Sequence, residues 1–176
     1  MKRFIISDLH FGHENVIKYC NRPFIDVEDM DKKLIENWNS VVSKDDIVYV
    51  LGDFTLSRRM DVIKHYVQAL NGFKVLVMGN HDTRKPKDYI EAGFTQATRK
   101  PIMIEPGVIF MHEPFVDDRF IADNYIYFFG HVHDKKCMMD NHSNCFCVCA
   151  DRINFYPVDF DSLLKNIKKI IQKDKK

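Results

Sequence analysis

Seven short apolar runs, rich in β-branched and aromatic residues, most strongly constrain the fold of this 176-residue chain. In the first half they alternate with helical segments, which predicts parallel strands joined by crossover helices. The second half is mostly strands, which we expect to form a second sheet packed on the first. We therefore predict one α/β domain over residues 1–176 with a two-sheet core. The runs span residues 3–7, 46–51, 74–78, 101–105, 107–111, 125–129 and 145–149.

Three segments have the apolar spacing of amphipathic helices. The first covers residues 26–42, with Asp26 as its candidate N-cap and an apolar side of Met30, Leu34, Trp38 and Val41. The second covers residues 58–72 and ends in Asn-Gly, a common helix stop. The third follows Asp159, another candidate N-cap, and has an apolar side of Leu163, Leu164, Ile167, Ile170 and Ile171.

The composition is that of an ordinary soluble globular protein, with 45% hydrophobic and 29% charged residues. A formal net charge of +1 provides no global field for a nucleic acid or a membrane. The chain shows no signal peptide and no apolar stretch near the roughly 20 residues of a membrane helix. We expect a cytoplasmic protein that does not bind membranes, and its oligomeric state is left open.

Five cysteines, an odd number without an export signal, favour reduced thiols. Cys145, Cys147 and Cys149 alternate along one run, so a strand would place them on one face. A zinc site would more typically show paired Cys-x-x-Cys spacing. We therefore interpret these cysteines as small buried side chains that pack a sheet.

Polar residues follow five of the apolar runs, where strands would end. The carboxyl ends of parallel strands are where sites form in open α/β sheets. Each residue alone has an ordinary explanation in turn chemistry, but chance turns have no preference for histidine. The residues are Asp8 and His10, Asp53, the run Asn80-His81-Asp82, His112, and the pair His131 and His133.

Seven of these side chains form a chemically sensible ligand set for borderline divalent metals. Two aspartates, one asparagine and four histidines exceed the needs of one tetrahedral ion. With one shared carboxylate they fit two ions about 3.5 to 4 Å apart. Asp53 is the natural bridge, and His81 is left available as an acid or a base. We interpret Asp82 as a helix cap, with orientation of His81 as the alternative.

These motifs, taken in order, resemble the five sequence blocks of the calcineurin-like metallophosphoesterase superfamily. The blocks are Asp8-x-His10, Gly52-Asp53, Gly79-Asn80-His81-Asp82, His112 and Gly130-His131-x-His133. The likeness is strongest to the small bacterial, archaeal and phage members. It implies a two-sheet β-sandwich flanked by helices, in four αββα layers.

The resemblance also implies the role of each ligand and the chemistry. One metal would take Asp8, His10, Asp53 and His133, and the other Asp53, Asn80, His112 and His131. A hydroxide bridging the two ions would attack phosphorus, with His81 as general acid. The expected cofactors are two divalent ions, manganese first, with iron, zinc or nickel as alternatives. The chain would thus be a metal-dependent phosphoesterase that hydrolyses a phosphodiester or a phosphomonoester. With 176 residues there is no room for a cap domain, and the open site that we therefore expect favours a diester.

Substrate contacts are less defined by the sequence. Besides Asn80 and His81, we predict that His13 and Arg22 contact the substrate phosphate, because both lie in probable loops and Arg suits bidentate phosphate contacts. His13 could equally bond to the backbone. The expected partner is a phosphate ester such as a nucleotide, a cyclic nucleotide or a nucleic-acid end.

Two other functions are carried as alternatives. The first is a phosphomonoesterase acting on nucleotides or phosphoproteins, which would need extra positive charge for a dianionic phosphate. The second is a non-catalytic, metal-bound interaction scaffold. Competent side chains at every metal position and at His81 argue against the scaffold.

Overall fold

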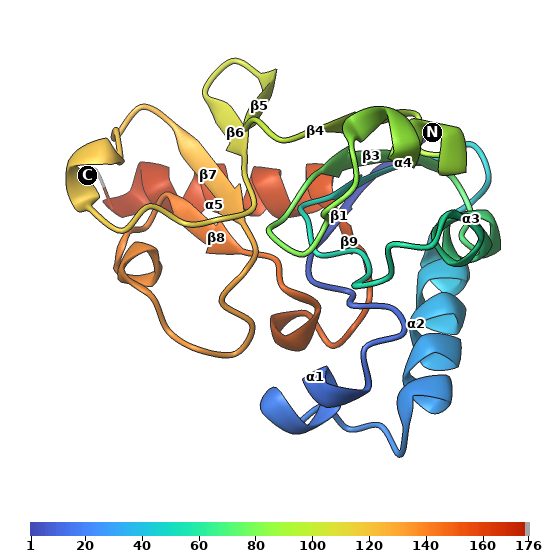
Figure 1. The fold of residues 1–176 in the computed structure, drawn as a ribbon. Coiled ribbons are helices and arrows are strands. Elements are labelled where there is room, and N and C mark those ends of the chain that lie inside the picture. The colour runs from blue at the N-terminus through green and yellow to red at the C-terminus, as the bar shows by residue number, and fades with distance from the viewer. Residues whose placement is uncertain (175–176) are drawn as a thin grey trace.

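Five strands form the first sheet of the computed structural model, which describes residues 1–174, with side chains described through Ile171 (Figure 1). Its order is β4-β3-β2-β1-β9. The first four strands in chain order are parallel, and only the C-terminal strand β9 runs antiparallel to its neighbour. The strands are β1 (Arg3–Ile6), β2 (Ile47–Val50), β3 (Phe73–Val77), β4 (Gln96–Thr98) and β9 (Val158–Asp159).

The second sheet has four strands in the order β5-β6-β7-β8. Strands β6, β7 and β8 are parallel, and β5 forms an antiparallel pair with β6. A single parallel bridge between Ser7 and Cys149 joins the end of β1 to the end of β8. The strands are β5 (Ile102–Glu105), β6 (Val108–Phe110), β7 (Ile126–Phe129) and β8 (Cys145–Cys147).

Helices cover the outer face of the first sheet. Strand residues such as Val48 and Leu76 pack there against Trp38 and Ile63 from two of the helices. Figure 1 shows α2 beside α3, with α1 below them. The helices on this side are α1 (Glu14–Tyr19), α2 (Val27–Val41), α3 (Met60–Ala69) and α4 (Pro86–Ala92).

The core between the sheets is built from the alternate side chains of the same strands. Ile5 and Leu51 meet Phe110 and Phe128 of the second sheet in one buried cluster. Helix α5 (Phe160–Asp174) contributes Phe160, Leu164 and Ile167 to this cluster. This arrangement confirms the predicted two-sheet α/β fold flanked by helices.

Loops and short 3₁₀ helices, η1 (Asp118–Phe120) and η2 (Met138–Asn141), accompany the outer face of the second sheet. Met139 of η2 packs there with Tyr127, Phe129 and Cys145. A third 3₁₀ turn, η3 (Ala150–Arg152), follows β8. The cysteine interpretation is confirmed in part: Cys145 is buried and Cys147 partly buried on this side, and Phe146 and Val148 pack in the core between the sheets. Cys149 follows β8 and is also buried, with its Sγ 3.2 Å from Oδ2 of Asp8.

Several local predictions need correction. Helix α1, helix α4 and strand β4 were not predicted, because each is too short for a clear period. Val41 and Ile170 were expected on apolar helix sides but are exposed, and Val42 is buried in place of Val41. The Asp26 cap is confirmed by a 2.8 Å hydrogen bond from the Asp29 backbone N–H.

None of the helices in the described part of the chain has the length and apolar character needed to cross a membrane.

Candidate metal centre

All seven predicted metal ligands follow the carboxyl ends of strands β1, β2, β3, β6 and β7. The two sheets meet along β1 and β8, so loops from both sheets converge at one place. Asp8, His10, Asp53 and His112 are buried there, while Asn80 and His131 are exposed. The buried four form the floor of the site, and the exposed two lie on its solvent side.

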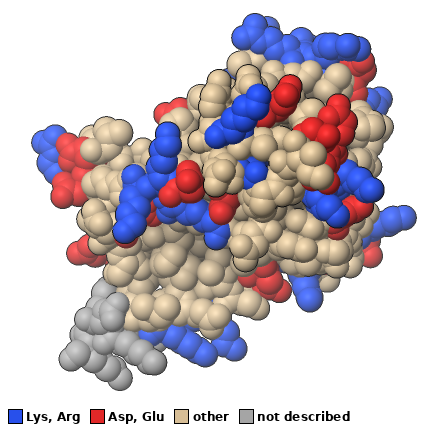
Figure 2. Space-filling model, turned by 90° about the horizontal axis from the view of Figure 1, so that it is seen from below, with Lys and Arg blue, Asp and Glu red and all other residues tan. Residues whose placement is uncertain are grey.

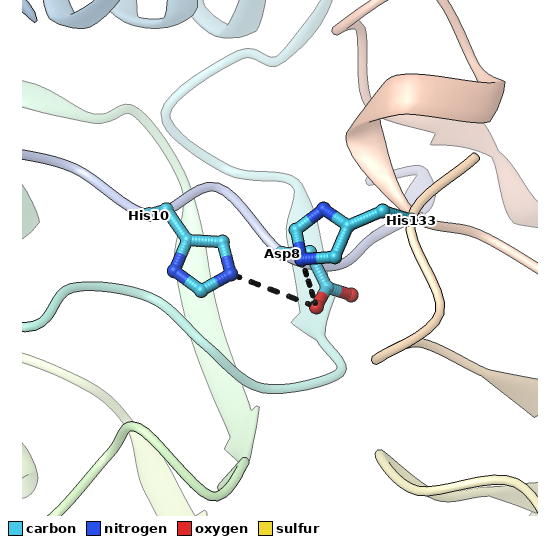
Figure 3. Close-up of side chains that lie close together, drawn as sticks. All are labelled: Asp8, His10 and His133. Carbon is cyan, nitrogen blue, oxygen red and sulfur yellow. Dashed lines mark ion pairs between the residues drawn. The ribbon is translucent and has the colours of Figure 1, made fainter. Parts of the chain in front are cut away.

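The first ligand set consists of Asp8, His10 and His133 (Figure 3). Oδ1 of Asp8 lies 3.9 Å from Nε2 of His10 and 3.8 Å from Nε2 of His133. The other carboxylate oxygen, Oδ2, accepts a 2.9 Å hydrogen bond from the His131 backbone N–H. Asp8 is therefore fixed through one oxygen and directs the other toward the two imidazoles.

The second ligand set consists of Asp53, His112 and His131. Oδ1 of Asn80 lies 3.0 Å from both Nε2 of His112 and Nδ1 of His131. Nδ1 of His112 is 2.7 Å from the Leu51 carbonyl oxygen. That contact fixes a tautomer with the proton on Nδ1 and leaves Nε2 free to bind a metal.

Asp53 lies between the two sets. Its Oδ2 is 3.5 Å from Nε2 of His10 in the first set and 3.5 Å from Nε2 of His112 in the second. Its Oδ1 accepts a 2.9 Å hydrogen bond from the backbone N–H of His81. One oxygen of Asp53 therefore faces an imidazole of each set, and the backbone holds the other.

The electrostatics of the floor favour a cation. Burial opposes ionisation of Asp53, but His112 and His10 outweigh burial and lower its pKa to about 2. Burial likewise opposes a charged His112, but Asp53 and Asp8 outweigh it and raise its pKa to about 9. The carboxylates thus stabilise positive charge strongly at this point.

Unpartnered buried atoms supply an independent test of whether metals fit. Within the described residues, Oδ1 of Asp8 and both ring nitrogens of His10 are buried without a hydrogen-bond partner. Such groups are costly unless something satisfies them. Carboxylate and imidazole donors that converge within 4.8 Å of one another match divalent transition metals. The residues therefore fit bound divalent cations.

Backbone strain is concentrated at the same residues. Eight non-glycine residues between 1 and 174 have positive φ, and five of them are candidate ligands: Asp8, His10, Asp53, His131 and His133. This conformation costs of order 1–3 kcal/mol per residue and persists only where the surroundings enforce it. The conformations that turn these side chains toward one point therefore lower the stability of the fold.

Glycines next to the ligands allow the loops to approach closely. A Cβ on Gly79 would lie 2.2 Å from Oδ1 of Asp53, and one on Gly130 would lie 2.5 Å from Oδ2 of Asp8. Neither position has space for a side chain. The Gly79-Asn80 and Gly130-His131 pairs therefore reflect packing around the carboxylates, whereas a Cβ on Gly52 would meet the ring of His112 at 2.3 Å.

The structure corrects the role predicted for Asp82. Its Oδ2 accepts hydrogen bonds from the backbone N–H groups of Asp53 (2.8 Å) and Gly79 (2.9 Å), and its Oδ1 accepts one from Phe54 (3.1 Å). It neither caps α4, whose N-cap is Lys85, nor contacts His81 in these bonds. Burial raises its pKa to about 7, although the Gly79 and Phe54 N–H groups oppose the shift. Asp82 therefore joins the loops after β2 and β3.

Replacing Asp82 by Asn is expected to destabilise the fold by about 3 kcal/mol, because an amide nitrogen cannot accept from the buried N–H that it would face. Denaturant unfolding of the metal-free protein measures the free energy. Asp123→Asn, an exposed site with the same charge change, is the control. A loss within 0.5 kcal/mol of the control, roughly the range of neutral surface substitutions, would contradict the joining role.

Arg22 was predicted to contact substrate, and the structure corrects this. Its side chain is fully buried and forms a two-point pair with Asp151, with Nε–Oδ1 and Nη2–Oδ2 distances of 2.9 Å. It also donates to the carbonyl oxygens of Asp8 (2.7 Å) and Leu9 (2.9 Å), and Nη1 contacts the Met30 sulfur. The protein itself engages these donors, so Arg22 holds the loop of the first ligand set.

Asp151 is a site residue that the sequence reasoning missed. Its Oδ2 lies 2.8 Å from Nδ1 of His133, whose Nε2 faces Asp8. Burial opposes its ionisation, but His133 and Arg22 outweigh burial and lower its pKa to about 2. Asp151 ends the run Cys-Val-Cys-Ala-Asp, so the rule that identified the candidate metal ligands, a polar residue after an apolar run, would have found it.

Asp151→Asn is expected to weaken metal binding at the first set about 10- to 100-fold, because His133 loses the charged partner that orients it. Calorimetric titration of metal-free protein with Mn²⁺ measures the effect. Asp134→Asn, an exposed carboxylate beside His133 in the chain, should bind Mn²⁺ like the parent. Equal affinities in the two variants would contradict an orienting role.

His81 and His13 lie at the solvent side of the centre. Nε2 of His81 is 4.0 Å from Oδ2 of Asp53, and 42% of its side chain is exposed. The ring of His13 lies 5.5 Å from that of His10, and its buried Nδ1 has no partner in the described residues. His13 therefore faces the site, and its Nδ1 is not used in a backbone hydrogen bond. His65 is exposed on α3 and belongs to neither ligand set.

Comparison with known proteins agrees with this geometry. The chain is 38% identical to an uncharacterized protein of Methanocaldococcus jannaschii, over 96% of this chain and 92% of that one. It is 30% identical to the Gene 66 protein of Mycobacterium phage L5, over 75% of this chain and 77% of that protein. A solved structure of an Aquifex aeolicus protein of unknown function shares the fold, with a TM-score of 0.72, 24% identity, and coverage of 93% of this chain and 98% of that one.

The model of the calcineurin-like phosphoesterase superfamily domain matches residues 1–149, which include every candidate metal ligand. The resemblance carried by the strand-end motifs is thereby confirmed over most of the chain. This protein belongs to the calcineurin-like phosphoesterase superfamily.

Proposed function

We propose that the protein is a metal-dependent phosphodiesterase. The observation that carries this proposal is the position of Asp53, whose Oδ2 lies 3.5 Å from an imidazole of each ligand set. Asp8, His10 and His133 would hold one ion, and Asn80, His112 and His131 the other, with Asp53 shared. When bound, the ions supply positive charge for the phosphoryl oxygens and lower the pKa of a coordinated water.

The chain's own residues would orient the substrate and move one proton. Asn80, His131 and the partly exposed His81 lie on the side from which substrate can approach. A water molecule forms the new bond to phosphorus and releases one proton to solvent, the bond between phosphorus and the leaving oxygen breaks, and His81 donates the proton that this oxygen takes up. No covalent bond between enzyme and phosphorus is required.

Two cavities support a diester over a monoester. The Arg99 cavity, about 380 Å³, adjoins Asn80 and His112 and is also lined by Arg99, Glu113 and Phe115. The α1 cavity, about 510 Å³, adjoins His10, His81 and His133 and is also lined by Tyr19, Val132, Lys135 and Lys136. Both sizes are typical of ligand sites. The centre has room on each side, as a phosphate with two ester arms needs.

The test compares bis-p-nitrophenyl phosphate with p-nitrophenyl phosphate on metal-stripped protein refilled with Mn²⁺. We expect activity that returns with the metal and favours the diester. A preference for the monoester would redirect the search to phosphatase substrates. Two bound ions without hydrolysis of either compound would favour the scaffold alternative.

A further inference from the structure

The α1 cavity differs from the Arg99 cavity in what it offers a ligand. Its described lining contains two lysines, Lys135 and Lys136, and no acidic residue. In the described lining of the Arg99 cavity, Glu113 accompanies Arg99, the only lysine or arginine there, and Arg99 already donates to the carbonyl oxygens of Asp82 and Arg84. An additional anionic group is therefore better placed in the α1 cavity.

A row of aromatic rings leads from the metal centre into this cavity. The His10 and His13 ring centroids are 5.5 Å apart, and those of His13 and Tyr19 are 6.4 Å apart in an edge-to-face arrangement. Tyr19 lies at the end of α1, is 72% exposed, and lines this cavity. Exposed rings beside basic side chains form a stacking surface for nucleobases.

The position of His81 identifies which arm of the substrate would occupy the cavity. His81 lines the α1 cavity, whereas the described lining of the Arg99 cavity does not include it. An acid must reach the oxygen of the leaving group. The arm in the α1 cavity is therefore the one released.

The surface charge limits the size of that arm. Figure 2 shows the molecule from below, the side on which α1 lies in Figure 1, and its basic and acidic side chains are interspersed. A long nucleic acid is typically held by an extended basic face. Lys135 and Lys136 instead offer a local contact for one further phosphate.

We propose that the α1 cavity binds a nucleotide-sized leaving arm, with its base against Tyr19 and a second phosphate at Lys135 and Lys136. This inference rests on the proposed phosphodiesterase function. It names the substrate class as phosphodiesters whose released alcohol is a nucleoside that carries another phosphate.

Equilibrium binding tests the cavity independently of catalysis. The probes are thymidine 3′,5′-bisphosphate, thymidine 5′-monophosphate and inorganic phosphate, titrated calorimetrically into the Mn²⁺-loaded full chain. We expect the bisphosphate to bind about ten-fold more tightly than the monophosphate, as one added charge-assisted hydrogen bond would provide. Equal affinities of the two nucleotides would overturn the proposal.

Variants of Lys135, Lys136 and Tyr19 test whether these residues cause the differences in nucleotide affinity. Lys135→Gln with Lys136→Gln should remove the preference for the bisphosphate, whereas Lys32→Gln with Lys33→Gln on the exposed face of α2 should leave it unchanged. Tyr19→Ala should weaken both nucleotides about ten-fold without affecting inorganic phosphate, and Tyr19→Phe should retain their affinity. A preference that survives the loss of both cavity lysines would overturn the proposal.

Product analysis tests the direction of cleavage. Dithymidine monophosphate that carries one additional terminal phosphate should yield two thymidine monophosphates, because the released arm retains the terminal phosphate. Thymidine and thymidine bisphosphate would mean that the other arm leaves, which would overturn the assignment. Failure to cleave any diester would count against the proposed function, and the binding experiment would still decide whether the cavity takes nucleotides.

Discussion

Asp53→Asn is expected to lower hydrolysis of bis-p-nitrophenyl phosphate about 10³-fold, which corresponds to roughly 4 kcal/mol of transition-state stabilisation. The substitution keeps the shape of the side chain and one oxygen for the His81 N–H, but it removes the charge next to both His10 and His112. Both ions should bind more weakly, and the content of Mn²⁺ after dialysis measures this directly.

The matched control is Asp45→Asn, which makes the same change at an exposed position before β2. It should keep the parent's activity and metal content. Full activity with two ions in the Asp53 variant would show that the bridge is elsewhere. Loss of one ion only would place Asp53 in a single ligand set.

His81→Asn is expected to slow turnover by about 10²- to 10⁴-fold for diesters with alkoxide leaving groups, because such oxygens need a proton as they depart. The loss should be much smaller for a nitrophenolate, which is stable without one. Both ions should stay bound, since His81 belongs to neither ligand set. The difference is measured by comparing the hydrolysis rates of two diesters of the same phosphate, one that releases nitrophenolate and one that releases methoxide.

His65→Asn serves as the control, because His65 is exposed on α3. It should leave both rates unchanged. An equal loss for the two leaving groups in the His81 variant would contradict proton donation. A role in placing the phosphate would then account better for the residue.

The sequence was sufficient to predict the parts of the fold that depend on strong local patterns. Runs such as 47–51 and 75–78 are apolar throughout because β2 and β3 are covered on both faces. Ligand residues after such runs were predictable because the ends of parallel strands converge. The prediction that these seven side chains come together is matched by the distances, although their binding of metal stays a prediction.

Other features depend on contacts between distant segments, and local patterns do not contain them. Arg22 had the properties of a phosphate-binding loop residue, but Asp151, 129 positions away in the chain, engages it instead. Asp82 had the properties of a helix cap in the sequence. Its actual backbone partners, Asp53 and Phe54, come from another loop, so the local pattern could not show them. Short elements such as α1 are formed by tertiary packing, so they lack a period that the sequence could show.

The wide spread of the ligands along the chain links metal binding to folding. The first set alone combines loops that follow β1 and β7, so no ion can be fully coordinated until both sheets are paired. Each ion then acts as a ligand of the native state only. At a free concentration 100 times its dissociation constant, it should add about 2.7 kcal/mol to the free energy of unfolding. Divalent ions would thus stabilise the completed fold, and chelation would lower its melting temperature.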